Sequence, residues 1–309
     1  MDLSLLLRSA IVGVAHHPWV RRAVTGTPPG RALATRFVAG ETLPEAIEVA
    51  GELDRHRIAA MLDHLGENVE TQAQAAQARD AYLDAIDALA ARPQIDGAIS
   101  VKLTQLGLDL SEDGCWAHLA PVLDAAEAAR ILVMIDMESH PYVDATLAVL
   151  RRAHERTPSV GVAIQSYLLR SRNDVFSLPP GCRVRLVKGA YLEPPAFVYV
   201  DKRDVDASYA RLFATLFARG HAIDVATHDP GLIAGVRRIV DAVDDGWSRV
   251  EFQMLYGVRR DLQAMLAGQG YPVRVYIPYG SEWYPYLTRR MAERPANLLF
   301  FLSNLVRTR

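Results

Sequence analysis

Residues 271–297 read YPVRVYIPYGSEWYPYLTRRMAERPAN and contain a complete strand–turn–helix unit. The apolar run Val273–Ile277 has the length of a buried strand, and the Pro-Tyr-Gly-Ser sequence (278–281) is typical of a turn. A helical pattern then starts at about Trp283. A strand that leads directly into a helix is the building unit of parallel sheets, in which neighbouring strands are joined by helical crossovers.

The same unit recurs along most of the chain. Short apolar runs without amphipathic alternation are each followed by a longer helical pattern. The eight apolar runs are Ile58–Leu65, Ala98–Leu103, Leu132–Met137, Val160–Gln165, Val184–Val187, Ala222–Ala226, Val250–Met254 and Val273–Ile277. The helical patterns follow at roughly 71–91, 116–129, 142–155, 167–176, 204–219, 230–243, 258–268 and 284–294. Continuous apolar strands joined by helices predict a parallel sheet that is buried on both faces.

Eight such units predict an α/β fold of the closed (βα)8 TIM-like barrel type, which typically takes about 250 residues. A doubly wound open sheet is the alternative. Open sheets of that class usually carry a glycine fingerprint after their first strand, and no G-x-G-x-x-G occurs in this sequence. The barrel is therefore the favoured prediction.

The first 56 residues lack this alternation and predict an N-terminal helical arm. A Thr-Gly-Thr-Pro-Pro-Gly break (25–30) separates one helical pattern from the next, and Thr42-Leu43-Pro44-Glu45 has the composition of a helix start. We therefore expect two parts, a helical arm over residues 1–56 and a barrel catalytic domain over residues 57–309.

Composition limits the partners and the compartment. Of the 309 residues half are apolar, and 34 basic against 36 acidic residues give a net charge of −2. Without a long basic run, nucleic acid is not expected as a partner. Cys115 and Cys182 have neither metal-ligand nor redox spacing, so we expect reduced thiols and no metal site. Residues 3–15 are apolar, but Asp2 and Arg8 disfavour a signal peptide, and no run has transmembrane length, so a cytoplasmic protein is expected.

Polar groups end most of the predicted strands. In a (βα)8 barrel the carboxyl ends of the strands carry the chemistry. These ends hold Lys102, Asp136-Met137-Glu138, Gln165, Lys188-Gly189-Ala190-Tyr191, Thr227-His228-Asp229, Gln253 with Tyr256, and Tyr276. Thr227 or Asp229 alone could be a helix cap, but a purely structural barrel does not need two lysines, an aspartate and two glutamines there. The joint pattern predicts an active site.

The last helical pattern carries a cationic face. Tyr286, Arg289, Arg290 and Glu293 recur at i, i+3, i+4 and i+7, which places them on one side of a helix. Two neighbouring guanidiniums bind a carboxylate in a planar, two-point way that lysine cannot reproduce. The alternative is a solvated charged face with an Arg–Glu pair.

Six motifs in order along the barrel resemble those of the proline dehydrogenase family. They are VKLTQLGL (101–108), MIDME (134–138), RLVKGAY (185–191), ATHD (226–229), EFQMLYG (251–257) and YIPYG…YPYLTRRMAE (276–293). The resemblance implies a distorted (βα)8 barrel that binds FAD and oxidises L-proline to 1-pyrroline-5-carboxylate. It further implies hydride transfer to flavin N5 and a membrane quinone as the electron acceptor. The cofactor would perform the redox chemistry, and the protein would supply orientation and charge.

The resemblance also implies residue roles at the substrate. Arg289 and Arg290 match the pair that clamps the substrate carboxylate, and Glu293 matches the carboxylate that holds an arginine in place. Tyr276 and Tyr286 match aromatic residues around the proline ring. Two further matches are Lys102, a second cation of the site, and Asp136, whose simpler interpretation is an ion-pair partner of Lys102.

For the flavin, the family pattern carries over to Met137, Gln165, Arg185, Lys188, Gly189, Ala190, Thr227 and His228. A cation near flavin N5 favours the anionic reduced ring, and Arg185 or Lys188 could supply it. Gly189 lets a phosphate or ribose of the cofactor come close to the backbone. Gln165 can both donate to and accept from the pyrimidine edge of the flavin ring. The plainer alternatives are a solvated strand end for Lys188 and a helix cap for His228.

The sequence departs from the family pattern at two places and leaves other functions open. Asp229 stands where the family often has Asn, and Ser281-Glu282-Trp283 replaces a Thr-His-Glu run; both departures lie near the expected cofactor or lid. The chain reads as the single-activity form. The alternatives are a Schiff-base barrel enzyme using Lys102 or Lys188 and a non-catalytic scaffold. A quinone acceptor would imply transient peripheral contact with a membrane, and the oligomeric state is not fixed by the sequence.

Overall fold

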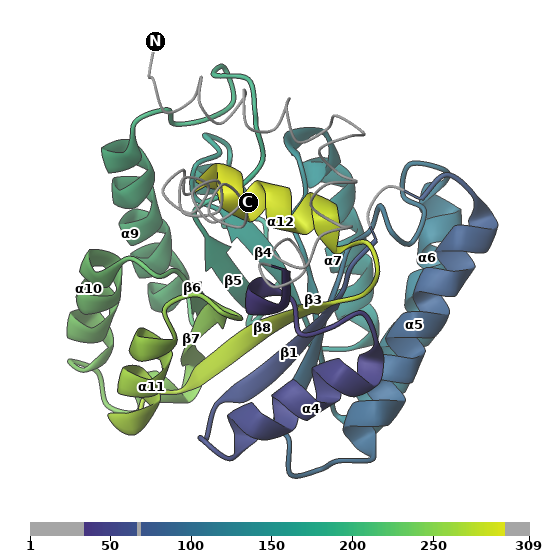
Figure 1. The fold of residues 1–309 in the computed structure, drawn as a ribbon. Helices are drawn as coiled ribbons and strands as arrows, with labels where there is room; N and C mark the ends of the chain where they lie inside the picture. Colours follow the sequence, from purple (N-terminus) through teal and green to yellow (C-terminus); the bar gives the residue numbers. More distant parts are fainter. Residues whose placement is uncertain (1–33, 67–68, 294–309) are drawn as a thin grey trace, which may run out of the picture.

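The structure is a computed structural model that describes residues 34–66 and 69–293, with side chains up to residue 288. Eight parallel strands form a closed barrel in which each strand pairs with its sequence neighbours and β1 pairs with β8 (Figure 1). The strands are β1 Ala59–His64, β2 Gly97–Val101, β3 Leu132–Ile135, β4 Val160–Gln165, β5 Arg183–Val187, β6 Ala222–Ala226, β7 Val250–Leu255 and β8 Val273–Tyr279. The predicted barrel is confirmed, and the open-sheet alternative is wrong.

Helices alternate with the strands and cover the outside of the barrel. They are α4 Leu43–Asp54, α5 Gln72–Ala90, α6 Glu112–Ala129, α7 Val143–Arg156, α8 Ser171–Asp174, α9 Lys202–Ala218, α10 Pro230–Val240, α11 Arg260–Gly268 and α12 Trp283–Glu293. Two 3₁₀ turns, η1 His140–Tyr142 and η2 Gly246–Arg249, precede α7 and β7. One continuous apolar core fills the layer between strands and helices.

The helix expected over 167–176 is wrong, because only the four residues of α8 are helical. The reason is competition for backbone hydrogen bonds. The amide of Tyr167 donates to Lys188 O, Leu168 bridges Val198, and the amide of Leu169 donates to Phe197 O. The segment after β4 is therefore paired with the long connection after β5.

The start of α4 has the predicted capping chemistry. Thr42 and Glu45 form a reciprocal capping box. The helix lies along β1 and β8 (Figure 1), and its Ala46, Ile47 and Ala50 belong to the barrel core. Most of the expected arm lies outside the described residues, so the boundary at residue 56 stays a prediction.

A second apolar cluster holds α12 across one end of the barrel (Figure 1). It joins Phe37 and Val38 from the segment before α4, Leu65 from the end of β1, and Trp283 and Leu287 from α12. The amide of Ala39 donates to Pro278 O at 2.9 Å, and that of Gly280 donates to Gly40 O at 3.0 Å. Residues 34–40 thus fix the point where β8 turns into α12.

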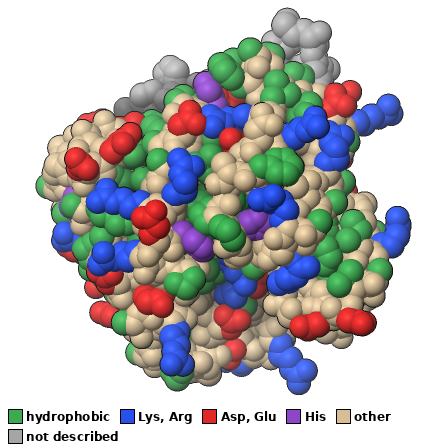
Figure 2. Space-filling view, turned by 180° about the vertical axis from the view of Figure 1, so that it is seen from behind, with side chains coloured by type: hydrophobic (Ala, Val, Ile, Leu, Met, Phe, Trp, Pro, Cys, Tyr) green, Lys and Arg blue, Asp and Glu red, His purple; other side chains and the backbone are tan. Residues whose placement is uncertain are grey.

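The barrel interior is charged, whereas the interior of most (βα)8 barrels is filled by branched apolar side chains. Toward the amino-terminal ends of the strands, Arg183 Nη1 binds Asp224 Oδ1 at 2.5 Å, and Arg274 Nε binds Glu251 Oε1 at 2.8 Å. Burial and the nearby Glu251 raise the pKa of Asp224 to about 6. The outer surface is mixed, and Figure 2 shows basic and acidic side chains interspersed over one face.

Candidate active site

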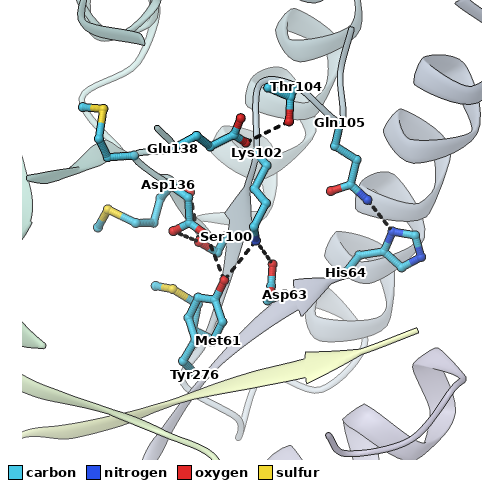
Figure 3. A network of polar contacts seen from close by, with 12 residues as sticks. Met61, Asp63, His64, Ser100, Lys102, Thr104, Gln105, Asp136, Glu138 and Tyr276 are labelled. Carbon is cyan, nitrogen blue, oxygen red and sulfur yellow. Dashed lines mark hydrogen bonds and ion pairs between the residues drawn. The ribbon is translucent and has the colours of Figure 1, made fainter. Parts of the chain in front are cut away.

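The polar side chains at the carboxyl ends of β1, β2, β3 and β8 meet in one network (Figure 3). Lys102 Nζ lies 2.6 Å from Asp63 Oδ1, 3.0 Å from Asp136 Oδ2 and 3.2 Å from the hydroxyl of Tyr276. The Tyr276 hydroxyl donates to Asp136 Oδ2 at 2.8 Å. The strand register brings these groups together. Asp63 pairs with Ser100, Ser100 with Met134 and Tyr276 with Met61, so these positions point to one face of the sheet, as do the positions two residues further along β2 and β3.

The network sets the ionisation of its members. Burial alone would raise the pKa of Asp136, but Lys102 and Arg185 outweigh it and hold the pKa at about 2. Burial raises the pKa of Asp63 in spite of Lys102 and raises that of Tyr276 well above its usual range. At neutral pH, Asp136 is therefore an anion and Tyr276 keeps its proton.

Arg185 lies next to this network and is buried inside the barrel. Its Nη1 donates to Asp136 Oδ1 at 2.5 Å and to Ser100 Oγ at 3.1 Å, and its Nη2 contacts the sulfur of Met61. The guanidinium carbon is 5.1 Å from the centre of the Tyr276 ring. The three residues predicted as catalytic, Asp136, Arg185 and Tyr276, are thus in mutual contact.

A second group of predicted residues surrounds the ends of β3 and β4. Gln165 Nε2 donates to the carbonyls of Met137 at 2.9 Å and Glu138 at 2.7 Å. Its Oε1 is buried and has no hydrogen-bond partner among the described residues. A buried amide oxygen without a donor is costly. An N–H from a bound group would satisfy it, so these residues fit a flavin pyrimidine edge.

Lys188 has a different environment from the one expected. Its Nζ donates to Asp206 Oδ1 at 2.5 Å and to Asp229 Oδ2 at 2.9 Å, so it is not the solvated strand end of the plainer interpretation. Lys202, at the start of α9, binds the same two carboxylates. These four residues link β5, β6 and the amino-terminal end of α9.

The end of β6 shows which of the expected caps forms. Asp229 is the N-cap of α10 and accepts from the amide of Gly231 at 3.0 Å, and Thr227 Oγ1 accepts from the amide of Asp229 at 3.2 Å. His228 does not cap the helix. Its Nε2 accepts from the amide of Leu255 at 3.1 Å, so the neutral ring carries its proton on Nδ1.

Gly189 and Ala190 follow β5 at the same end of the barrel. Gly189 has a φ of +113°, and a Cβ there would lie 2.1 Å from the Tyr167 ring. The structure thus gives a second reason for glycine besides a close approach to a cofactor, namely the packing of Tyr167 on the backbone.

The comparisons with known proteins decide the family. The sequence matches the family model for proline dehydrogenase over residues 46–302. The chain belongs to the proline dehydrogenase family. It is 40% identical to proline dehydrogenase of Deinococcus radiodurans over 308 residues, covering 98% of each chain. It is 39% identical to proline dehydrogenase 1 of Bacillus subtilis over 277 residues, which cover 89% of this chain and 91% of that protein.

The fold is similar to solved structures of the same family. Proline utilization A (PutA) from Bdellovibrio bacteriovorus, inactivated by N-propargylglycine, superposes with a TM-score of 0.78 at 26% identity. The match covers 85% of this chain and 32% of the PutA chain, so the present chain spans about a third of that longer protein. Family membership gives the reaction, which is the oxidation of proline, the first step of proline catabolism. The family is generally flavin-dependent.

The Schiff-base alternative finds no support in the geometry of Lys102. A lysine nucleophile must lose its proton, and the usual device is a desolvated amine without anionic neighbours. Lys102 is buried but lies between the carboxylates of Asp63 and Asp136, which favour its charged form. Lys188 likewise binds two carboxylates.

The predicted clamp lies only partly within the described structure. Arg289, Arg290 and Glu293 are on α12, but their side chains lie outside the described residues. Tyr286 is buried in the cluster that holds α12 to residues 34–38. The clamp role therefore stays a prediction.

Among the described helices, none is long and apolar enough to cross a bilayer.

Sequence reasoning missed Asp63. It lies inside the apolar run Ile58–Leu65, which the sequence predicts as a buried strand. In the structure its side chain is 1% exposed and binds Lys102, while its Oδ2 lacks a partner among the described residues. The available signal was the charge itself, because an unpaired aspartate is rarely buried in a strand. Ser100, in the middle of β2, was missed because nothing in its local sequence marks it.

Proposed function

We propose that this chain oxidises L-proline to 1-pyrroline-5-carboxylate with FAD and passes the electrons to a quinone. The observation that carries the proposal is the buried Lys102–Asp136–Arg185–Tyr276 network at the carboxyl ends of the strands. This is the end at which (βα)8 barrels place their chemistry. Bound FAD would accept a hydride from the proline ring, and the ring nitrogen would release a proton.

The chain's own residues would hold and orient the two reactants. We propose Met137, Gln165, Arg185, Lys188, Gly189, Ala190, Thr227 and His228 as the cofactor-binding residues. The unpartnered Oε1 of Gln165 supports this proposal. His228 lies on the same rim, where its Nε2 accepts from the amide of Leu255.

For the substrate we propose a grip by Arg289 and Arg290 on the carboxylate, with Glu293 holding the arginines and Tyr286 beside the ring. Tyr276 keeps its proton, because burial raises its pKa, and its hydroxyl donates to Asp136. We propose that its ring walls in and orients the proline ring. Lys102 shares its charge with two carboxylates, and its main effect is to keep Asp136 ionised. Asp136 is thus an electrostatic partner of the developing positive charge on the ring nitrogen.

The experiment is an anaerobic titration of the purified protein with L-proline, followed by visible absorbance. We expect a yellow protein whose flavin bands bleach with one equivalent of proline per flavin. A colourless protein that also rejects added FAD would refute the proposed cofactor. A flavin that proline does not bleach would refute the proposed substrate site.

The acceptor is tested separately. We expect the proline-reduced protein to be reoxidised faster by a quinone in lipid vesicles than by dissolved oxygen. Vesicle sedimentation with and without proline then measures the transient membrane contact that a lipid-soluble acceptor requires. Equal reoxidation rates with quinone-free and quinone-loaded vesicles would contradict the quinone assignment.

A further inference from the structure

Gln253 connects Arg185 to the charged layer at the other end of the barrel. It points inward from β7 and is buried. Its Oε1 accepts from Arg185 Nε at 2.7 Å, and its Nε2 donates to Glu251 Oε1 at 2.8 Å. An amide has one acceptor end and one donor end, so this pair of partners permits only one orientation of the side chain.

Glu251 is itself fixed as an anion. Burial opposes its ionisation, but Arg274 and Arg183 outweigh this effect and lower the pKa of Glu251. Arg274 Nε and Nη2 bind the two oxygens of Glu251 at 2.8 and 3.3 Å. Arg274 Nη1 also donates to the carbonyls of Ala60 and Asp96, each at 3.1 Å. The acceptor that orients Gln253 is therefore anchored to the backbone of the barrel.

The hydrogen bond at Arg185 Nε matters because it determines where the two Nη groups of the guanidinium point. With Nε held by Gln253, the plane of Arg185 is set, and Nη1 reaches Asp136 and Ser100. Without that acceptor, Arg185 would retain a buried Nε–H with no partner and a side chain with several rotatable bonds. It would then be free to settle elsewhere among the nearby carboxylates, including Asp224.

We propose that Gln253 is a positioning residue that aims Arg185 at the reactants, with Glu251 and Arg274 as its support. The inference rests on the proposed flavin function, in which Arg185 is the cation beside the cofactor. It assigns a role in the reaction to a residue that acts through its hydrogen bond to Arg185. A charge-assisted contact that must be in place before the transition state is the kind of interaction whose loss lowers the rate of the chemical step.

The test is the rate of flavin reduction by proline under anaerobic stopped-flow conditions. For Gln253→Leu we expect the limiting rate to fall about 10-fold or more. We expect the proline concentration at half the limiting rate to change less than about threefold, because the carboxylate grip on α12 is not altered. In an Arg185→Met background the same substitution should have little further effect. Full additivity in that background would overturn the proposal, as would an unchanged rate in the single variant.

Gln253→Glu gives an independent readout if the leucine variant folds poorly. The new carboxyl lies next to Glu251, and two carboxyls in contact share a proton. While that proton is bound, one oxygen can accept from Arg185 and the other can donate to Glu251, as the native amide does. We expect a near-normal reduction rate at about pH 6 that falls as the pH rises, and a pH-independent deficit would contradict the role.

Gln263→Leu is the matched control. Gln263 is also buried, and its amide donates to the carbonyls of Leu255 and Val258 near the end of the same strand. We expect this variant to lose stability and keep the limiting rate of flavin reduction. An equal loss of rate in both glutamine variants would show that the effect is structural. If the wild-type flavin itself is not reduced by proline, the proposed function fails before this test applies.

Discussion

Lys102 is the residue whose removal the structure makes easiest to evaluate. Its ammonium lies between Asp63 and Asp136, at 2.6 and 3.0 Å, and its side chain is 6% exposed. Lys102→Met keeps the length and packing of the side chain but removes the charge. Asp136 would retain Arg185, Ser100 and Tyr276 as partners. Asp63 would lose its ion-pair partner.

The expected loss of free energy of unfolding comes mainly from Asp63, because Asp136 keeps other partners and Asp63 loses its ion-pair partner. Removing one member of a buried ion pair typically costs about 3–5 kcal/mol, because the other charge stays buried. Asp63 can limit this cost by taking up a proton. Burial already raises its pKa and Lys102 lowers it, so the variant should raise the pKa further. Each pH unit above the ordinary aspartate pKa then adds about 1.4 kcal/mol to the free energy needed to keep Asp63 protonated in the folded state.

The sign of the pH dependence is fixed. With a raised pKa, the folded state holds a proton on Asp63 that the unfolded state has released above about pH 4. Stability of the variant therefore falls as the pH rises from there toward the folded-state pKa. We expect a deficit of about 3–5 kcal/mol against wild type at pH 8 and a smaller deficit at pH 6.

The assay is urea unfolding followed by far-ultraviolet circular dichroism at both pH values. The control is the double variant Lys102→Met with Asp63→Asn, in which no unpaired charge remains at position 63. We expect this variant to recover at least half of the lost free energy and to lose the additional pH dependence. A single-variant deficit below about 1 kcal/mol at pH 8, or no recovery in the double variant, would refute the reasoning.

Three further predictions follow from single sites. Arg290→Met should lower kcat/KM for proline about 10²- to 10⁴-fold, mainly through KM, with flavin content retained; an unchanged KM would remove the arginine from the clamp. Lys188 and a neighbouring lysine outweigh burial and lower the pKa of Asp229, so its contribution to stability is complete above about pH 5 and is lost as the pH falls below about 4. Asp229→Asn should flatten acid unfolding in that window, and an unaltered acid-unfolding curve would contradict this. Gly189→Ala should cost about 1–3 kcal/mol in thermal unfolding, because its Cβ would lie 2.1 Å from Tyr167 at a φ of +113°; an unchanged melting temperature would argue against that clash.

Much of the fold was predictable because its signals are local. Strand-length apolar runs followed by helical periodicity predicted the eight strands, and the observed strands agree with the predicted ranges to within a few residues. The helix start at Thr42 carries its own capping residues. The helix expected over 167–176 could not be rejected from the sequence, because the segment that competes for its backbone lies near Val198.

The features of the site likewise fall into those set by local sequence and those set by tertiary structure. The sequence by itself determined that polar residues end the strands, and its motifs identified the family, since both are properties of short contiguous segments. Only the tertiary structure decided that Lys102 meets Asp63, that Gln253 accepts from Arg185, and that Lys188 turns to Asp206 and Asp229. These partners are between 18 and 68 residues apart in sequence. Closure of the barrel and the inward or outward facing of each strand position bring them together, and the cost of burying a charge without a partner then selects the pairs that form.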